Sequence, residues 1–196
     1  VAPFYKRIDN PIYGKSYVET NVTYNDRFYE RISFSQPTNA DTGRIAGVEF
    51  SYQNYFSSLP SPWNGFGVNL NYTRTDSSAT LFERADDVPF FKQSDNVGNV
   101  SALFEKYGVA AQVSMSFNSP SLESVGANAA GDGYDDWYKV WDIKVSAPIA
   151  GGLRGLIELS NFNDQHRVSY AGNPDFRTAD ERYSWSLFSG IDWRLR

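Results

Sequence analysis

Apolar and polar residues alternate along this chain, most regularly between residues 46 and 73. The even positions from 46 to 52 are Ala, Val, Phe and Tyr, and the odd positions between them are Gly, Glu and Ser. After the turn-forming residues 60–65 the pattern resumes, and Phe66, Val68, Leu70 and Tyr72 alternate with Gly and Asn. A period of two residues is typical of a strand with one apolar and one polar face, so these residues predict a β-hairpin.

The same alternation recurs farther along the chain, and with the opening segment, residues 2–13, counted as a first strand it gives eight strands in all. We expect them at residues 2–13, 46–53, 66–73, 97–107, 109–117, 137–147, 153–163 and 183–196. Residues 60–65, 107–108 and 150–152 are short turns, whereas residues 14–43, 76–96, 118–136 and 164–182 are long, polar loops. Short turns at one end of a sheet and long loops at the other are typical of an outer-membrane β-barrel.

Composition narrows the class of protein. The chain has 196 residues, a formal net charge of -5 and no cysteine, so neither a basic nucleic-acid surface nor a disulfide framework is indicated. No apolar run approaches the roughly 18 to 20 residues of a spanning helix, but a membrane strand needs only about 9 to 11 alternating residues. The first residue is Val1, so we expect that a signal peptide was removed or that the chain is a piece of something longer.

Aromatic residues make up 16% of the chain, and several lie where an interfacial girdle would form. Tyr52, Tyr55, Phe56, Trp63 and Phe66 cluster near one predicted turn, and Tyr107, Trp185 and Trp193 lie on other predicted strands. The apolar faces are therefore predicted to contact lipid and the polar faces to line a lumen, because only a closed sheet leaves no backbone unpaired in a bilayer. The residues predicted to face the lumen or a plug are Glu49, Gln53, Asn69, Asn71, Gln112, Asp142, Arg154, Glu158, Asp192 and Arg194.

Several of these segments resemble the C-terminal part of the barrel of TonB-dependent outer-membrane transporters. The resemblance lies in "FYKRIDNPIY", "GRIAGVEFSYQNYFSSLP", "GFGVNLNYTRTDS", "LFEKYGVAAQVSMSF", "GLRGLIELSNFND" and "RYSWSLFSGIDWRLR", in this order. The G-x-E strand with its L-P turn and the following N-Y-T are the most specific signals. The resemblance covers residues 1–196 apart from the long loops, and it implies an antiparallel transmembrane segment of about eight strands within a barrel of about 22 strands.

The resemblance also implies a function, a location and partners. Members of this family import scarce nutrients such as ferric siderophores, cobalamin or saccharides across the bacterial outer membrane, with energy relayed by TonB. The expected partners are therefore the remaining N-terminal barrel and plug, in the same or a separate chain, TonB through the plug-bearing part, and outer-membrane lipid. Aromatic and charged loop residues are candidates for substrate capture: Tyr24, Phe28, Tyr29, Phe90, Phe91, Tyr134, Phe176 and Arg177.

Enzyme chemistry is not indicated. His166, the one histidine, stands in a polar stretch at the end of a predicted strand, and we expect an exposed loop residue rather than a catalytic base. G-x-S-x-G, H-E-x-x-H and phosphate-binding glycine loops are missing from the sequence, so we predict neither a catalytic site nor a cofactor. Residues 129–137 bring Asp132, Asp135 and Asp136 together without the full spacing of a calcium loop, so a solvated turn is favoured over a metal site.

The sequence leaves two alternatives open. The strand count also permits a complete eight-stranded outer-membrane barrel with a structural or adhesive role. A secreted β-sandwich that binds carbohydrate through its aromatic residues is the other alternative. The apolar face discriminates between membrane and soluble forms, because a monomeric soluble sandwich rarely exposes a large apolar patch.

Overall fold

The computed structural model describes residues 1–81 and 84–193, and this part of the chain is all-β. The strands are β1 (Ala2–Asp9), β2 (Ile12–Tyr24), β3 (Arg27–Asn39), β4 (Thr42–Tyr55), β5 (Phe66–Ala79), β6 (Asn96–Lys106), β7 (Val109–Asn118), β8 (Ser121–Ser124), β9 (Gly133–Asp135), β10 (Tyr138–Pro148), β11 (Leu153–Ser160), β12 (Arg167–Ala171), β13 (Arg177–Glu181) and β14 (Ser186–Trp193). Two 3-10 turns, η1 (Trp63–Gly65) and η2 (Ala129–Gly131), accompany them. Within the described ranges, no helix has the length and apolar character needed to cross a membrane.

Eight strands form one antiparallel sheet, which we call the main sheet, in the order β1-β4-β5-β6-β7-β10-β11-β14. These correspond to the eight predicted strands, so the all-β, antiparallel prediction is confirmed. The first is shorter than predicted, because Asn10 adopts a positive φ of 55° and Pro11 follows it. The last begins at Ser186 rather than at residue 183, and the predicted residues 194–196 lie outside the described part.

The turns fix the register of the sheet. Between β6 and β7, Tyr107 and Gly108 both have positive φ values, 55° and 76°, as a two-residue type I′ hairpin requires. The turn places Lys106 opposite Val109, and the pairing continues to Val97 opposite Asn118. Because strand side chains alternate with a period of two, this register decides which residues share a face.

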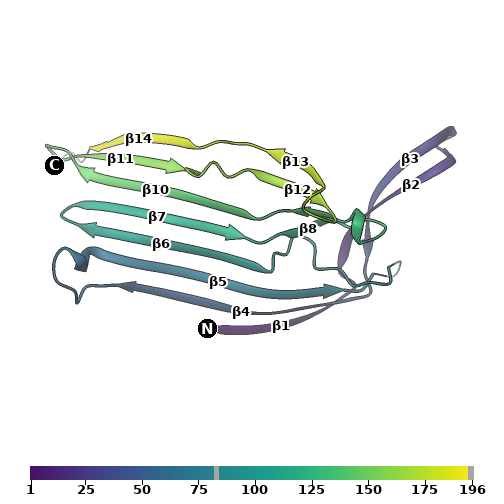
Figure 1. Ribbon diagram of the computed structural model, residues 1–196, viewed down its shortest axis with the longest axis horizontal. Helices are drawn as coiled ribbons and strands as arrows, with labels where there is room; N and C mark the ends of the chain where they lie inside the picture. Colours follow the sequence, from purple (N-terminus) through teal and green to yellow (C-terminus); the bar gives the residue numbers. More distant parts are fainter. Residues whose placement is uncertain (82–83, 194–196) are drawn as a thin grey trace.

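The long connections are folded, and here the prediction of polar loops was wrong. Residues 14–43 lie largely in the β2–β3 hairpin, and the connections 118–136 and 164–182 contribute a second sheet in the order β13-β12-β9-β8. We call this second sheet, together with the connection between β5 and β6, the cap. In Figure 1 the cap and the hairpin lie at one end of the main sheet, and the short turns lie at the opposite end.

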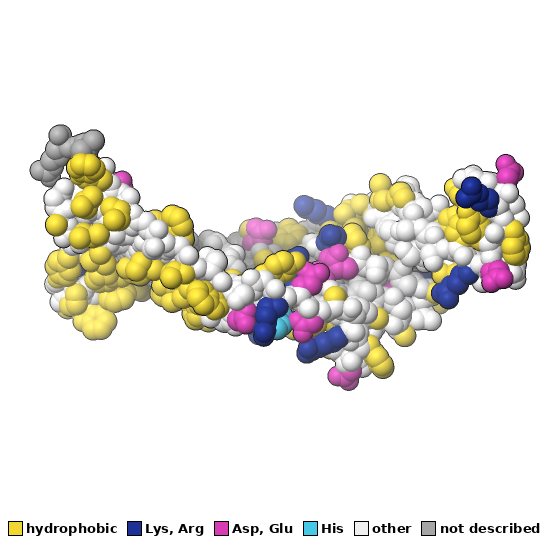
Figure 2. Space-filling view, turned by 90° about the horizontal axis from the view of Figure 1, so that it is seen from above, with side chains coloured by type: hydrophobic (Ala, Val, Ile, Leu, Met, Phe, Trp, Pro, Cys, Tyr) yellow, Lys and Arg dark blue, Asp and Glu magenta, His cyan; other side chains and the backbone are white. Residues whose placement is uncertain are grey.

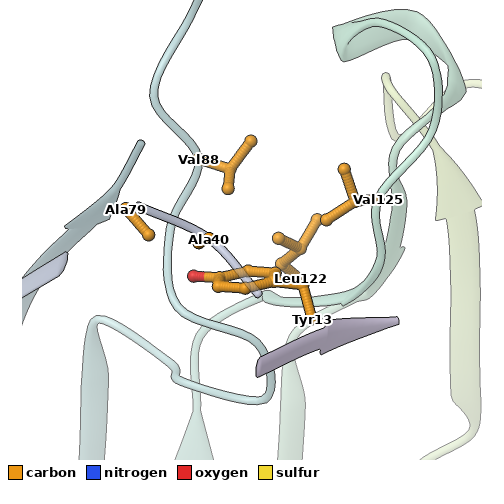
Figure 3. Close-up of a cluster of buried hydrophobic side chains, with 6 residues drawn as sticks. All are labelled: Tyr13, Ala40, Ala79, Val88, Leu122 and Val125. Carbon is orange, nitrogen blue, oxygen red and sulfur yellow. The ribbon is translucent and has the colours of Figure 1, made fainter. Parts of the chain in front are cut away.

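The buried core lies where the cap meets the base of the β2–β3 hairpin and the end of β5. Its members are Tyr13, Ala40, Ala79, Val88, Leu122 and Val125, drawn in Figure 3. They come from the base of the hairpin, the end of β5 and the cap. The cap is thereby anchored to the main sheet by hydrophobic burial, whereas the large apolar side chains of the main sheet are either exposed or only partly buried.

The main sheet is open at both edges. Among the described residues, β1 pairs with β4 alone and β14 pairs with β11 alone. The two edge strands lie on opposite sides of the sheet in Figure 1. The structure therefore contains no closed barrel within residues 1–81 and 84–193.

Candidate functional site

One face of the main sheet, the apolar face, is continuous from strand to strand. Leu70, Val100, Met115 and Trp141 are successive cross-strand partners on β5, β6, β7 and β10. The same face continues through Ile143 on β10 and its successive cross-strand partners, Leu159 on β11 and Leu187 on β14. Directly paired residues point to the same side of a sheet, so the apolar residues of the predicted alternation share one surface.

Aromatic side chains border this face near both ends. Near the short turns, Phe66 stacks on Trp63 with ring centroids 5.7 Å apart and contacts Phe104 at 4.9 Å. Near the cap, Tyr72 and Phe117 lie 6.4 Å apart. Phe66 and Tyr72 are six residues apart on β5, which corresponds to about 20 Å along a strand. The aliphatic residues of the face lie between these two aromatic rows.

The apolar character stops at the row near the cap. The Tyr72 hydroxyl donates a hydrogen bond to Asn96 Oδ1 at 2.7 Å, and Arg74 Nη1 donates to the same oxygen at 3.1 Å. On β10, Lys139 lies two residues before Trp141, on the same face and closer to the cap. A tyrosine that keeps its ring on apolar surface and its hydroxyl on polar groups is typical of an interfacial position.

Figure 2 views the molecule from the side of β14. Hydrophobic side chains gather at the short-turn end, and charged side chains gather farther along, around the histidine. The exposed apolar residues of β14 include Leu187, Ile191 and Trp193. The apolar face thus extends to this edge of the main sheet.

The residues predicted to face the lumen lie on the opposite face of the main sheet, which we call the polar face. Gln53, Asn69, Ser101, Ser114 and Asp142 are successive cross-strand partners on five strands. The register places the rest of the predicted set, Glu49, Asn71, Gln112, Arg154, Glu158 and Asp192, on the same face. Arg194 lies outside the described residues. The sequence therefore predicted correctly that these residues share a face, and what that face contacts stays a prediction.

Polar contacts run across this face. Lys144 forms an ion pair with its cross-strand partner Glu158. Arg154 Nη2 donates a hydrogen bond to Ser146 Oγ at 2.9 Å. Asp142 Oδ1 accepts a hydrogen bond from the backbone N–H of Asn161 at 2.9 Å. A face built from such groups is suited to water or to a polar partner rather than to lipid.

The loop candidates for substrate capture divide into two groups. Tyr24 and Phe28 lie exposed near the tip of the β2–β3 hairpin, and Tyr29 is half-buried beside them. Phe176 is exposed, and Arg177 forms an ion pair with Asp180 at 3.7 Å. Tyr24, Phe28 and Phe176 are therefore accessible from solvent at this end of the sheet.

The other loop candidates belong to the packing of the cap. Phe90 packs against the buried core, with its ring 6.1 Å from that of Tyr13. Tyr134 also packs there and stacks on Tyr170 at 5.4 Å. Phe91 is partly exposed, with the Lys92 ammonium 5.5 Å from its ring centroid. Phe90 and Tyr134 therefore have a structural role that the sequence did not indicate.

A buried ion pair holds the cap together. Arg84 Nη1 lies 2.6 Å from Asp132 Oδ1, and their side chains are 5% and 2% exposed. The same oxygen of Asp132 accepts a hydrogen bond from the Gly126 N–H at 2.8 Å. Arg84 also pairs with Asp86, which is more exposed. The sequence placed Asp132 in a solvated acidic turn, and this placement was wrong because a cation 48 positions away partners it.

The neighbouring acidic residues have other partners. Asp135 Oδ1 accepts from Ser169 Oγ at 2.8 Å, and Asp136 Oδ1 accepts from the Trp137 N–H at 2.7 Å. Across the described ranges, no group of three or more His, Cys, Asp or Glu side chains is arranged to hold a metal ion.

His166 takes part in a polar network beside β12. Arg182 Nε donates to His166 Nε2 at 2.6 Å, and His166 Nδ1 lies 2.7 Å from Asp180 Oδ1. A neutral imidazole that accepts at Nε2 carries its proton on Nδ1, from which it donates to the carboxylate. His166 lies in the loop before β12, so the predicted loop position is confirmed, although its side chain is only partly exposed because Asp180 and Arg182 contact it.

The cap end of the molecule contains several cavities. The first, about 340 Å³, is lined mainly by the hairpin base and by the segment after β8, including Tyr13, Tyr17, Leu81 and Val125. The second, about 420 Å³, is polar and lies between the cap and the main sheet; its lining residues are Lys92, Ser94, Asn118, Ser121, Glu123, Asp135, Asp136, Tyr138, Arg167 and Val168. We call this second cavity the polar cavity.

The Tyr13 hydroxyl provides a test of the packing around the first cavity. Burial raises the pKa of Tyr13 to about 12, above the value of about 10 expected in the unfolded chain. The stability linked to this group is therefore fully present below about pH 10 and is lost as the pH rises through the folded value. The tyrosinate absorbance of the wild type minus that of Tyr13→Phe should titrate near pH 12. A difference that titrates near pH 10 would contradict the burial of this phenol.

Comparisons with known proteins add no identification: no family model, curated protein or solved structure matches this chain. Its function must therefore be inferred from the fold and from the two faces of the main sheet. These features define an all-β protein built on an open, amphipathic antiparallel sheet with a folded cap at one end.

Proposed function

We propose that this chain is a segment of the β-barrel of an outer-membrane active transporter, which imports a scarce nutrient with energy relayed through TonB. The observation that carries the proposal is the main sheet, whose uncovered apolar face is bordered by aromatic rows near both ends. The resemblance of the strand sequences to TonB-dependent transporters supports the transport class.

Lipid is the environment that suits the apolar face. Exposed residues on it include Phe50, Tyr52, Trp141, Ile157 and Leu187. Soluble monomers rarely expose contiguous apolar patches of more than a few hundred Å², whereas a membrane barrel presents an apolar band of about 25 Å flanked by aromatic girdles. The spacing of the two aromatic rows on β5, about 20 Å along the strand, agrees with such a band.

The open edges support a larger barrel over a complete eight-stranded one. An eight-stranded barrel requires β1 to pair with β14, but these strands are the opposite edges of the main sheet. Unpaired backbone groups cost several kcal/mol each in hydrocarbon, so both edges need further strands in a membrane. We propose that the remaining barrel supplies these strands and that a plug meets the polar face.

The uncovered apolar face also counts against a soluble sandwich. In a sandwich, the inner faces of two sheets pack about 10 Å apart. Here the second sheet, β13-β12-β9-β8, lies at one end of the main sheet, and Val113 and Ile157 near the middle of the apolar face remain exposed.

Lipid contact is tested with two neighbouring positions on β11. Ile157 lies on the apolar face and Glu158 on the polar face, and the chain has no native cysteine. The variants Ile157→Cys and Glu158→Cys, each labelled with a small fluorophore, are incorporated as intact protein into vesicles containing brominated lipid. We expect strong quenching at position 157 and little at position 158. Equal quenching at both positions, or none at either, contradicts the proposal.

A further inference from the structure

The polar cavity lies where the polar face of the main sheet meets the cap. Asn118 and Tyr138, cross-strand partners at the ends of β7 and β10, form one wall. The cap supplies the opposite wall through residues of β8, β9 and β12. Its volume of about 420 Å³ falls in the usual range of small-molecule sites, roughly 300 to 1,000 Å³.

The lining mixes hydrogen-bond donors with acceptors. Carboxylates come from Glu123, Asp135 and Asp136, cations from Lys92 and Arg167, and neutral polar groups from Ser94, Asn118, Ser121 and Tyr138. Two cations and three carboxylates leave a formal charge of -1, so the cavity is close to neutral overall. Apart from Val168 and the Tyr138 ring, its walls offer little apolar surface.

Several of these groups are positioned but keep hydrogen-bonding capacity. Asp135 and Asp136 each use Oδ1 in their contacts, and their Oδ2 atoms accept no hydrogen bond from the described residues. Lys92 Nζ forms an ion pair with Glu123 Oε2 at 3.3 Å, and the Lys92 side chain stays largely exposed. The Arg167 guanidinium lies 5.8 Å from the centroid of the Tyr138 ring, which orients its N–H groups.

We propose that the polar cavity binds a neutral, polyhydroxylated ligand of the saccharide class. This inference rests on the proposed function and names the substrate class of that transporter. Each sugar hydroxyl both donates and accepts, so one ligand satisfies carboxylates and cations together. An anionic ferric chelate meets three carboxylates here, and a mainly apolar macrocycle finds few apolar walls. The hydroxyl groups of a saccharide match both the carboxylates and the cations that line the cavity.

The test measures binding of defined ligands to the intact, membrane-incorporated protein. Calorimetry is carried out with maltotriose, xylotriose and chitotriose, and with ferric citrate as an anionic chelate. The variant Asp136→Asn removes one cavity carboxylate charge, and Asp175→Asn makes the same change at an exposed cap position outside the cavity. Loss of a charge-assisted hydrogen bond should weaken trisaccharide binding roughly tenfold or more in the first variant and leave the second unchanged.

Three results would overturn the inference. In the first, ferric citrate binds and the substitution Asp136→Asn changes its affinity. In the second, both variants bind the trisaccharides with equal affinity. In the third, the protein binds none of the trisaccharides. The brominated-lipid experiment separates the two proposals. Failure of saccharide binding with lipid quenching intact rejects the substrate class alone, whereas loss of the quenching pattern rejects the membrane transporter itself.

Discussion

Replacing Leu187 with arginine is expected to destabilise the membrane-incorporated protein by about 2 to 4 kcal/mol. Leu187 pairs with Leu159 on the apolar face and is 60% exposed. In the proposed barrel that exposed surface contacts lipid between the two aromatic rows, where a guanidinium loses its hydration. An unfolding titration in vesicles measures the effect.

The neighbouring residue provides the matched control. Ser186 pairs with Ser160 on the polar face, so Ser186→Arg places the same side chain toward water or the plug. We expect it to cost much less than Leu187→Arg. Equal effects of the two substitutions would contradict the assignment of the faces.

Removing the buried guanidinium should be the most damaging single change in the cap. Arg84→Ala leaves the Asp132 carboxylate buried with the Gly126 N–H as its remaining contact. An uncompensated buried charge costs about 3 to 5 kcal/mol. Hydrogen exchange of amides in β8 and β9 should become faster, while that of β6 and β7 should change little.

Asp86→Ala is the control for this prediction. It removes the more exposed partner of the same guanidinium, and exposed ion pairs contribute about 1 kcal/mol or less. If Asp86→Ala accelerates exchange in the cap as much as Arg84→Ala does, the buried pair is not what stabilises the cap.

Seven of the eight strands of the main sheet were predictable because one face of each is mainly apolar; in β1, Phe4 and Ile8 lie on the polar face instead. A period of two is visible wherever one side of a strand is apolar and the other polar, and the short turns are marked by residues such as Tyr107-Gly108. The membership of the polar face could be predicted from the same alternation, since residues such as Gln112 and Glu158 stand between apolar neighbours.

The cap was not predictable in the same way. In β13, Arg177–Glu181, polar residues lie on both sides of the strand and all are exposed, so there is no alternation to detect. β8 and β9 have four and three residues, too few for a periodic signal. The Arg84–Asp132 pair joins residues 48 positions apart, and only the folded chain brings them together.

The position of the cap gives the two ends of the main sheet different properties. The short-turn end carries compact turns such as Tyr107-Gly108, whereas the other end carries a buried core, a buried ion pair and the polar cavity. In the proposed transporter, the polar cavity therefore lies at the end of the polar face that is opposite the short turns.

The most direct test of the proposed transporter is the native mass of the species that contains this sequence. Outer membranes of the producing cells are extracted in mild detergent, and the mass of the intact species is measured before and after denaturation. We predict a membrane species several times heavier than 22.1 kDa that also contains a plug-bearing sequence, in the same or a separate chain. A lone membrane species of 22.1 kDa, or recovery of the sequence in the soluble fraction, would contradict the proposal.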